Sequence, residues 1–326
     1  MATTIALIFL AAVFFIILGR GADLLVGNLR AIADHTKIHP VLLGTLLGFL
    51  TTIPEFMVGL NAVSRGLPGL SLGNIWGGIM VILALILGSS IYLQREIKTD
   101  GRLVVILPSF ILIILSLFLG LRGTLHYYDG ALLMIAYFVL IYLDLKTGGQ
   151  YHKDESTEKI VLEQEKVGGR WQRAMQWRKN LQREFIWALA GLALVSISSY
   201  VIMEIADIAL TRLSVPPFLI GLLVFAIGTN LPEITVMLRS VKNKSGDLSF
   251  GHLVGSAVSN ILVLSILTFI APLTVNVNWR YYVLMLFIGL TLACISWFYV
   301  TKRRFERWEG AVLIALYLLF IAYELY

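Results

Sequence analysis

Residues 50–55 read Leu-Thr-Thr-Ile-Pro-Glu, and residues 228–233 read Gly-Thr-Asn-Leu-Pro-Glu, a second copy displaced by 178 residues. The similarity continues in one register as far as Gly77 and its counterpart Gly255. Each copy carries a glutamate directly after a proline within an otherwise apolar run. A carboxylate inside a membrane helix is costly and is a functional-site hypothesis by default. Two of them, Glu55 and Glu233, at corresponding places of two halves predict a transporter with its binding site at the repeat interface.

The composition places the chain in a membrane. Hydrophobic residues make up 58% of the sequence and charged residues 14%, and the mean hydropathy of +0.83 is far above that of soluble domains. The charges leave apolar runs of about 20 residues, the length that a helix needs to cross a bilayer. We therefore predict an all-α integral membrane protein with ten transmembrane helices, at residues 3–20, 40–64, 70–94, 103–121, 126–144, 185–211, 216–239, 249–271, 281–301 and 308–325.

Several other classes of protein are disfavoured by the sequence. The first apolar run has neither a basic n-region nor a small-residue cleavage site, so we interpret it as a retained helix. The single cysteine, Cys294, excludes disulfides within the chain and a cysteine-based metal site. The sequence contains no phosphate-binding glycine loop and no His-Glu-x-x-His or Gly-x-Ser-x-Gly motif. A membrane-embedded enzyme is therefore a remote alternative, and we expect no cofactor.

The basic residues predict how the chain crosses the membrane. With the N-terminus outside, 22 of the 26 Lys and Arg residues face the cytoplasm, and only Arg65, Arg122, Arg212 and Arg280 face outward. This bias follows the positive-inside rule. We expect a multi-pass protein of the cell (inner) membrane with both termini extracytoplasmic. The net charge of +6 then reports orientation, and no nucleic-acid partner is needed to explain it.

The predicted helices divide into two halves around a polar segment. The first five-helix repeat covers residues 1–144, a cytoplasmic basic linker covers 145–184, and the second five-helix repeat covers 185–326. Because five is an odd number, the second repeat enters the membrane in the opposite direction to the first. An inverted five-plus-five repeat is a construction typical of secondary transporters, which expose one midplane site alternately to each side.

The end of the linker has a composition of its own. Residues 170–183 combine five Lys or Arg residues with Trp171 and Trp177. This pattern favours a basic helix lying on the anionic inner leaflet of the bilayer. The alternative interpretation is a charged loop that simply obeys the positive-inside rule. The sequence does not indicate an oligomeric state.

The prolines predict the local structure of the site. A proline removes one backbone donor and disfavours the helical conformation of the residue before it, so both helices should break near mid-membrane. Such a break frees carbonyl groups for coordination. Oxygen-bearing side chains precede each proline: Thr51 and Thr52 in the first half, Thr229 and Asn230 in the second. Oxygen ligands that include two carboxylates, Glu55 and Glu233, suit a hard metal cation such as Ca²⁺ better than zinc or copper.

These motifs resemble the two alpha-repeats of the calcium/cation antiporter superfamily, of the sodium/calcium exchanger type. The second repeat is carried by residues 228–233 and by Gly251-His252-Leu253-Val254-Gly255-Ser256, ending at Asn260, and the first by residues 51–55 and 73–77. The resemblance implies a cation antiporter in which Glu55 and Glu233 bridge the transported ion. By position it also implies that the other ligands are Thr51, Thr52, Thr229, Asn230, Ser256 and Asn260.

The first repeat departs from the family pattern. Where the family has Gly-Ser-Asn-x-x-Asn, this chain has Gly at 77 and 78, Ile at 79 and Ile at 82, so the expected polar groups of the third helix are missing. Two glutamates balance one divalent cation or two protons, whereas three sodium ions need more oxygen ligands than remain. We therefore expect exchange of Ca²⁺, or a related cation, for H⁺ or Na⁺, and favour two protons. The missing groups also leave open a transport-dead or regulatory relative.

Two further groups of charged residues fall in or near the predicted helices. Glu204 and Asp207 are three residues apart and either line an ion path or sit at the extracellular end beside Arg212. Asp23 and Arg20 lie near the inner end of the first predicted helix, where we interpret them as a local pair or as side chains reaching the interface.

Overall fold

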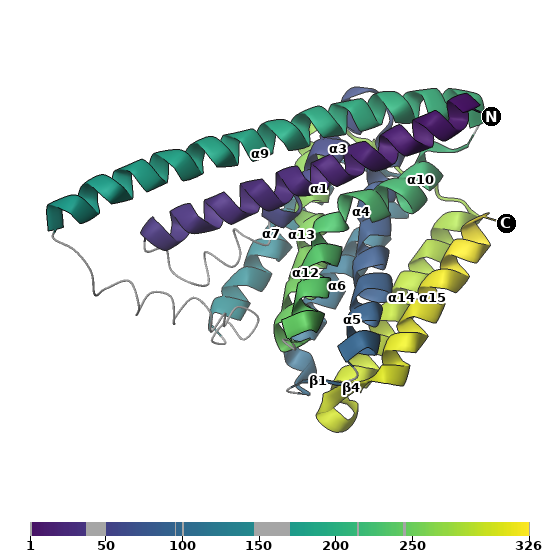
Figure 1. Cartoon of the computed structure of the whole chain (residues 1–326). Coiled ribbons are helices and arrows are strands. Elements are labelled where there is room, and N and C mark those ends of the chain that lie inside the picture. Colours follow the sequence, from purple (N-terminus) through teal and green to yellow (C-terminus); the bar gives the residue numbers. More distant parts are fainter. Residues whose placement is uncertain are drawn as a thin grey trace.

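The computed structural model describes residues 2–36, 50–94, 96–99, 101–146, 170–213, 215–243 and 246–325. These residues form a bundle of helices with two short strand pairs (Figure 1). Six helices are long and apolar enough to cross a membrane, and a seventh span results if the pair at Pro217–Thr229 and Leu231–Lys242, bent by 41°, is counted as one. Two shorter apolar helices add to them, at Ile106–Gly120 and Tyr127–Leu143. The all-helical membrane class predicted from composition is confirmed.

The first half of the described chain follows the predicted order of elements. It contains α1 (Ala2–Thr36), α3 (Ile53–Ser64), α4 (Pro68–Met80), the π-helix η1 (Val81–Ile86), α5 (Leu87–Gln94), β1 (Glu96–Lys98), α6 (Leu103–Gly120), β2 (Thr124–Leu125) and α7 (Tyr127–Lys146). The predicted second span, 40–64, is described only from residue 50 onward. The predicted first span, 3–20, is too short, because α1 continues to Thr36 and its apolar window runs from Phe9 to Leu29.

The second half repeats this order. It contains α9 (Arg170–Leu213), α10 (Pro217–Ile220), the π-helix η3 (Gly221–Phe225), α11 (Ala226–Thr229), α12 (Leu231–Asn243), α13 (Gly246–Ile270), β3 (Leu273–Thr274), α14 (Trp279–Val300), η4 (Thr301–Arg303), β4 (Arg304–Glu306) and α15 (Arg307–Leu325). Helix α9 begins at Arg170 rather than at residue 185, so the basic segment 170–183 is continuous with a membrane helix. Linker residues 147–169 lie outside the described part of the chain.

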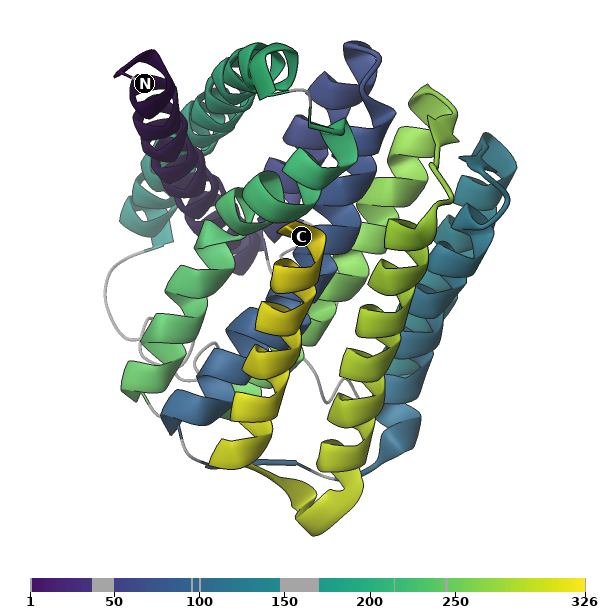
Figure 2. The ribbon, with the colours of Figure 1, turned by 90° about the vertical axis from the view of Figure 1, so that its right-hand side faces the viewer.

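Two strand pairs show the inverted relation between the halves. Strand β1 pairs antiparallel with β4, and β2 pairs antiparallel with β3. In each pair two buried apolar residues face each other, Ile97 with Phe305 and Leu125 with Leu273. Because the single helix α6 separates β1 from β2, the pairs lie at opposite ends of the bundle, with β1 and β4 at the lower end in Figures 1 and 2.

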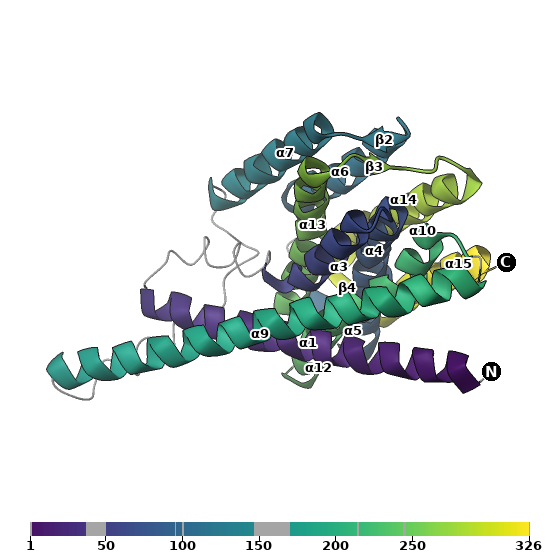
Figure 3. The same ribbon diagram turned by 90° about the horizontal axis from the view of Figure 1, so that it is seen from above.

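Corresponding helices of the halves occupy corresponding layers. The span Pro68–Gln94 is 94% buried and Phe250–Ile270 is 78% buried, so these two helices form the centre of the bundle. The spans in α1 and α9 are each only 33% buried. These two long helices run side by side along one flank (Figure 3), where Gly21 and Gly191 bring their backbones into close contact. Small residues at such crossings let membrane helices approach closely.

Helix α4 packs directly on the first part of the bent seventh span. Cβ atoms placed on Gly73 and on Gly221 would clash with the backbone of the facing helix, at the carbonyls of Phe218 and Leu70 respectively. A Cβ on Gly77 would lie 2.9 Å from both the Cβ of Ala226 and the carbonyl oxygen of Leu222. This backbone-to-backbone contact joins the two halves beside the second glutamate motif.

The repeat supplies a matched pair of glycines that tests this packing. Gly255 is the counterpart of Gly77, but a Cβ at Gly255 would meet no atom within 4 Å. We expect Gly77→Ala to destabilise the protein by about 1–3 kcal/mol through overpacking. We expect Gly255→Ala to be neutral or slightly stabilising, because alanine is the better helix former. Thermal unfolding of the detergent-solubilised variants checks this, and equal behaviour of the two variants would contradict the asymmetry of the interface.

Candidate functional site

The two glutamate motifs have nearly the same backbone geometry. Thr52 interrupts the helix before α3 with φ −91° and ψ 9°, and Asn230 interrupts the helix between α11 and α12 with φ −86° and ψ 17°. The carbonyl of each accepts the first hydrogen bond of the new helix, from the amide of Phe56 at 3.0 Å and of Ile234 at 3.1 Å. The breaks expected from the prolines are therefore confirmed, and each places its glutamate in the first turn of the new helix.

Both glutamates are enclosed in the bundle. Glu55 is 1% exposed and Glu233 is 0% exposed. The two carboxylates are near enough to repel one another electrostatically. Ser256 donates a hydrogen bond of 3.0 Å to Oε1 of Glu233. Within the described residues, Oε2 of Glu233 and both carboxylate oxygens of Glu55 accept no hydrogen bond of normal geometry.

Two asparagine side chains converge beside this pair. Asn230 donates from Nδ2 to the carbonyl of Ala226 at 2.7 Å, which leaves its Oδ1 without a partner among the described residues. Neither polar atom of the Asn260 side chain has a partner there. A Cβ on Gly78 would lie 3.1 Å from Nδ2 of Asn230 and 3.5 Å from Nδ2 of Asn260, so the two amides face the backbone of α4 at this glycine.

The structure adds Asn74 to the site, which the sequence reasoning did not select. Asn74 is fully buried on α4, and its Oδ1 lies 3.1 Å from the hydroxyl of Thr229. That hydroxyl also lies 3.0 Å from the carbonyl of Phe225 and close to the carboxylate of Glu55. The Nδ2 atom of Asn74 has no partner in the described chain. A buried amide in an otherwise apolar helix, paired in the repeat with His252, was the signal that could have identified it.

Asn74 supplies a polar group where the third helix lacks the family's own. It precedes Gly78 by one helical turn, so both residues lie on the same face of α4. Ile79 and Ile82, at the other two changed positions, are fully buried in the apolar core. The helix then continues as η1, a π-helical stretch of a kind that is frequent at functional sites. The first half therefore presents an amide one turn before Gly78.

Thr51 and Thr52 are also buried, at 7% and 1% exposure. The structure thus encloses every residue of the predicted ligand set within the bundle. In the described part of the chain, no group of three or more His, Cys, Asp or Glu side chains is arranged to hold a metal ion. A cation at this place would therefore be coordinated by the two carboxylates together with amide, hydroxyl and carbonyl oxygens, which is the ligand chemistry of Ca²⁺ and the alkali cations.

The other predicted acidic residues have different surroundings. Arg65 forms ion pairs with Glu204 at 2.9 Å and with Asp207 at 2.6 Å, and both acids are more than one third exposed. These two acids tie α9 to the end of α3 and do not belong to the buried site. Asp23 lies within the apolar window Phe9–Leu29 of α1 rather than beyond the helix end, because α1 is longer than expected.

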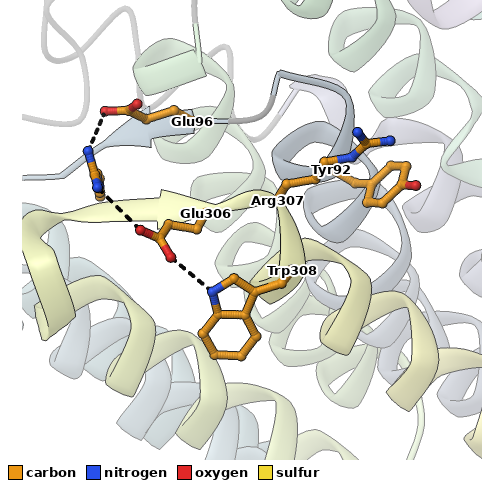
Figure 4. A pocket seen from close by; sticks show the side chains of 6 residues that line it. Tyr92, Glu96, Glu306, Arg307 and Trp308 are labelled. Carbon is orange, nitrogen blue, oxygen red and sulfur yellow. Dashed lines mark hydrogen bonds and ion pairs between the residues drawn. The ribbon is translucent and has the colours of Figure 1, made fainter.

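A surface pocket of about 590 Å³ lies away from the glutamate pair, at the strand pair β1–β4. Arg304 lies 3.6 Å from Glu96 and 3.3 Å from Glu306. Trp308 donates to Glu306 at 2.9 Å, and Figure 4 shows this contact together with the other lining side chains. Arg307 stacks on the ring of Tyr92. None of the residues that line this pocket belongs to the predicted ligand set.

Comparison with known proteins identifies the fold. Solved structures of the sodium-calcium exchanger NCX_Mj superpose with a TM-score of 0.64 and 22% identity, over 98% of this chain and 98% of that chain for a crystal soaked with Na⁺ and Sr²⁺. At that identity the similarity shows the fold alone. The putative antiporter CaxA of Alkalimonas amylolytica is 27% identical over 325 residues, covering 97% of this chain and 98% of CaxA.

Two further comparisons concern the family. The sodium/calcium exchanger MaX1 of Methanosarcina acetivorans is 29% identical over 143 residues, which cover 44% of this chain and 40% of MaX1. The sodium/calcium exchanger protein family matches residues 6–146 and 184–326, so the match covers both halves and omits only the linker and the first residues. The chain belongs to the sodium/calcium exchanger protein family.

Proposed function

We propose that the protein exchanges Ca²⁺, or a related hard cation, for H⁺ or Na⁺ at a site bridged by Glu55 and Glu233. The membership of the family supports cation antiport in general. The observation that supports this site is the burial of two carboxylates, close to each other, with three oxygens that lack hydrogen-bond partners in the described chain. Buried ionised carboxylates require compensating positive charge. A bound cation or bound protons supply it.

The charge of the site favours a particular exchange. Two carboxylates are neutralised by one divalent cation or by two protons, so the loaded site is uncharged in both states. Three sodium ions would need further oxygen ligands from the third helix, where Ile79 and Ile82 are instead packed in the apolar core. Asn74 adds one amide to the site and does not replace them all. We therefore favour one Ca²⁺ for two H⁺.

The transport-dead relative is the second candidate. It is favoured by Gly78, Ile79 and Ile82, which carry no ligand atoms on their side chains. The buried amides of Asn74, Asn230 and Asn260 argue against it, because unsatisfied buried polar groups are costly and persist where they bind something. The family match and the absence of enzyme motifs from the sequence lead us to propose a transporter rather than an enzyme.

The proposed orientation places the 147–169 linker and 21 of the 26 basic residues in the cytoplasm and both termini outside, because Arg20, counted with them from the sequence, lies within the apolar window of α1. Three of the four arginines on the opposite side have described ion pairs: Arg65 with Glu204 and Asp207, Arg122 with Asp129, and Arg280 with Glu324. Positive charge on that side is thus neutralised locally by these acids. We also propose that the basic start of α9, residues 170–183, contacts the anionic inner leaflet.

Cation binding at the glutamate pair predicts ligand-linked stability. Ca²⁺ at about one hundred times its Kd should stabilise the purified protein by about 2.7 kcal/mol, seen as a rise in Tm. Glu55→Gln and Glu233→Gln should each abolish this rise without lowering the Tm measured in the absence of cation, because each removes a buried negative charge. Glu204→Gln is the matched control, since Glu204 is an exposed acid outside the site. A Ca²⁺-induced rise that persists in both glutamine variants would exclude this site.

Exchange of one Ca²⁺ for two protons predicts how Ca²⁺ transport is coupled to a pH gradient. Ca²⁺ uptake into proteoliposomes should follow an imposed pH gradient in the absence of sodium and should generate little membrane potential, because two positive charges cross in each direction. A fluorescent pH indicator and a potential-sensitive dye measure the two properties together. Strictly sodium-dependent, electrogenic uptake would contradict two-proton exchange. No cation flux under any gradient would favour the transport-dead alternative.

The orientation has its own test. In a Cys294→Ser background, Ser156→Cys in the linker should resist an impermeant thiol reagent added to intact cells. Asn276→Cys, at an exposed position between β3 and α14, should be labelled readily because that loop faces outward. The opposite pattern of labelling would invert the proposed orientation.

A further inference from the structure

A third carboxylate lies beside the glutamate pair, on α1. Asp23 falls inside the apolar window of this helix and is half-buried. An acid at such a depth costs about 2.5–3.5 kcal/mol on insertion scales, so its presence calls for a role. The proposed exchange uses only Glu55 and Glu233, so it assigns no role to Asp23.

The packing of α1 places Asp23 next to the second glutamate motif. A Cβ on Gly19 would lie 3.4 Å from the Cβ of Leu231 and 3.8 Å from the Cδ of Pro232, the two residues that precede Glu233. Asp23 follows Gly19 by four residues and therefore lies on the same face of α1, about 6 Å further along the helix axis. The carboxylate of Asp23 is near enough to Glu233 to repel it electrostatically.

The direction of the two helices decides on which side of the site Asp23 lies. Helix α1 runs from the N-terminus toward Thr36, and α12 runs from Leu231 toward Lys242. In the proposed orientation both helices run toward the cytoplasm. Asp23 is therefore displaced from Glu233 toward the cytoplasmic end of the α1–α12 contact.

We propose that Asp23 forms a cation position on the cytoplasmic side of the glutamate pair, where a partly hydrated Ca²⁺ or similar cation pauses between the cytoplasm and the site. This inference rests on the proposed function. It assigns Asp23 to the path by which the cation passes between the cytoplasm and the glutamate pair. Carboxylates that line a low-dielectric cleft raise the local concentration of cations and the rate at which they bind. Asp23 lies on the cytoplasmic side of the glutamate pair and not on the other side. The two faces of the protein should therefore differ in apparent affinity.

The test compares the two faces in vesicles sorted by orientation, with the labelling of Ser156→Cys as the marker. Ca²⁺ transport is measured with Ca²⁺ presented from one face at a time. For Asp23→Asn we expect the KM for cytoplasmic Ca²⁺ to rise about tenfold, with the KM for external Ca²⁺ and the maximal rate little changed. Asp23→Glu, which keeps the charge, should restore the cytoplasmic KM. Raised ionic strength should weaken the cytoplasmic affinity of the unaltered protein more than that of Asp23→Asn.

Glu204→Gln serves as the control, because it removes an acid of a membrane helix that is paired with Arg65 at the far end. Equal KM values in Asp23→Asn and the unaltered protein would overturn the inference while leaving the proposed function intact. An equal rise in the KM for Ca²⁺ at both faces would also overturn the inference. So would a lower Tm of Asp23→Asn without a change in KM, since either result indicates a structural role. Absence of Ca²⁺ transport in the unaltered protein would instead refute the proposed function.

Discussion

The mutual repulsion of two carboxylates buried in an apolar bundle is the constraint on which the other features depend. Glu55 and Glu233 have almost no contact with solvent, and three of their four oxygens lack hydrogen-bond partners in the described chain. Such a pair is tolerated only where positive charge can reach it. The broken helices, the hydroxyl of Ser256 and the surrounding amides all provide polar groups at this one depth.

Close packing between the halves brings those polar groups together. Glycines at 73, 77 and 221 let α4 contact the backbone of the helix before Asn230, so Asn74 reaches Thr229 across the repeat interface. Gly78 leaves room for the amides of Asn230 and Asn260. The same residue is one of the positions where the family's side chains are missing. The position on α4 that lacks a side chain, Gly78, is thus the one that the amides of Asn230 and Asn260 from the other half approach.

The two flanking helices differ from the centre in a way that fits access to the site. The spans of α1 and α9 are one third buried, whereas the central helices are mostly enclosed. Helix α9 is joined to α3 at one end through Arg65, and α1 contacts the start of α12 at Gly19. The acids of these helices consequently have separate roles. Glu204 and Asp207 pair with Arg65, and Asp23 lies beside the candidate site.

Much of the architecture follows from the sequence alone. Hydropathy and the positive-inside bias predict membrane helices and their direction because the bilayer imposes fixed lengths and charge preferences on each segment separately. The displaced copies of one motif identify the two glutamates and the helix breaks, since proline acts on its own backbone. The predicted first helix is too short because the charges of Arg20 and Asp23 interrupt the apolar run, although α1 continues to Thr36. Charged residues within a helix do not by themselves show where that helix ends.

The tertiary structure decided which polar residues share a site. Asn74 stands alone in its segment, and only the glycine-mediated contact of α4 with the other half places it against Thr229. Arg65 pairs with Glu204 and Asp207 over more than 130 positions of sequence, a partnership that spacing does not encode. Asp23 lies near Glu233 because α1 crosses α12 at Gly19. The sequence determines each residue's depth and chemistry, whereas the packing of helices distant in the chain determines its neighbours, because those contacts depend on side-chain volumes at interfaces that no single segment contains.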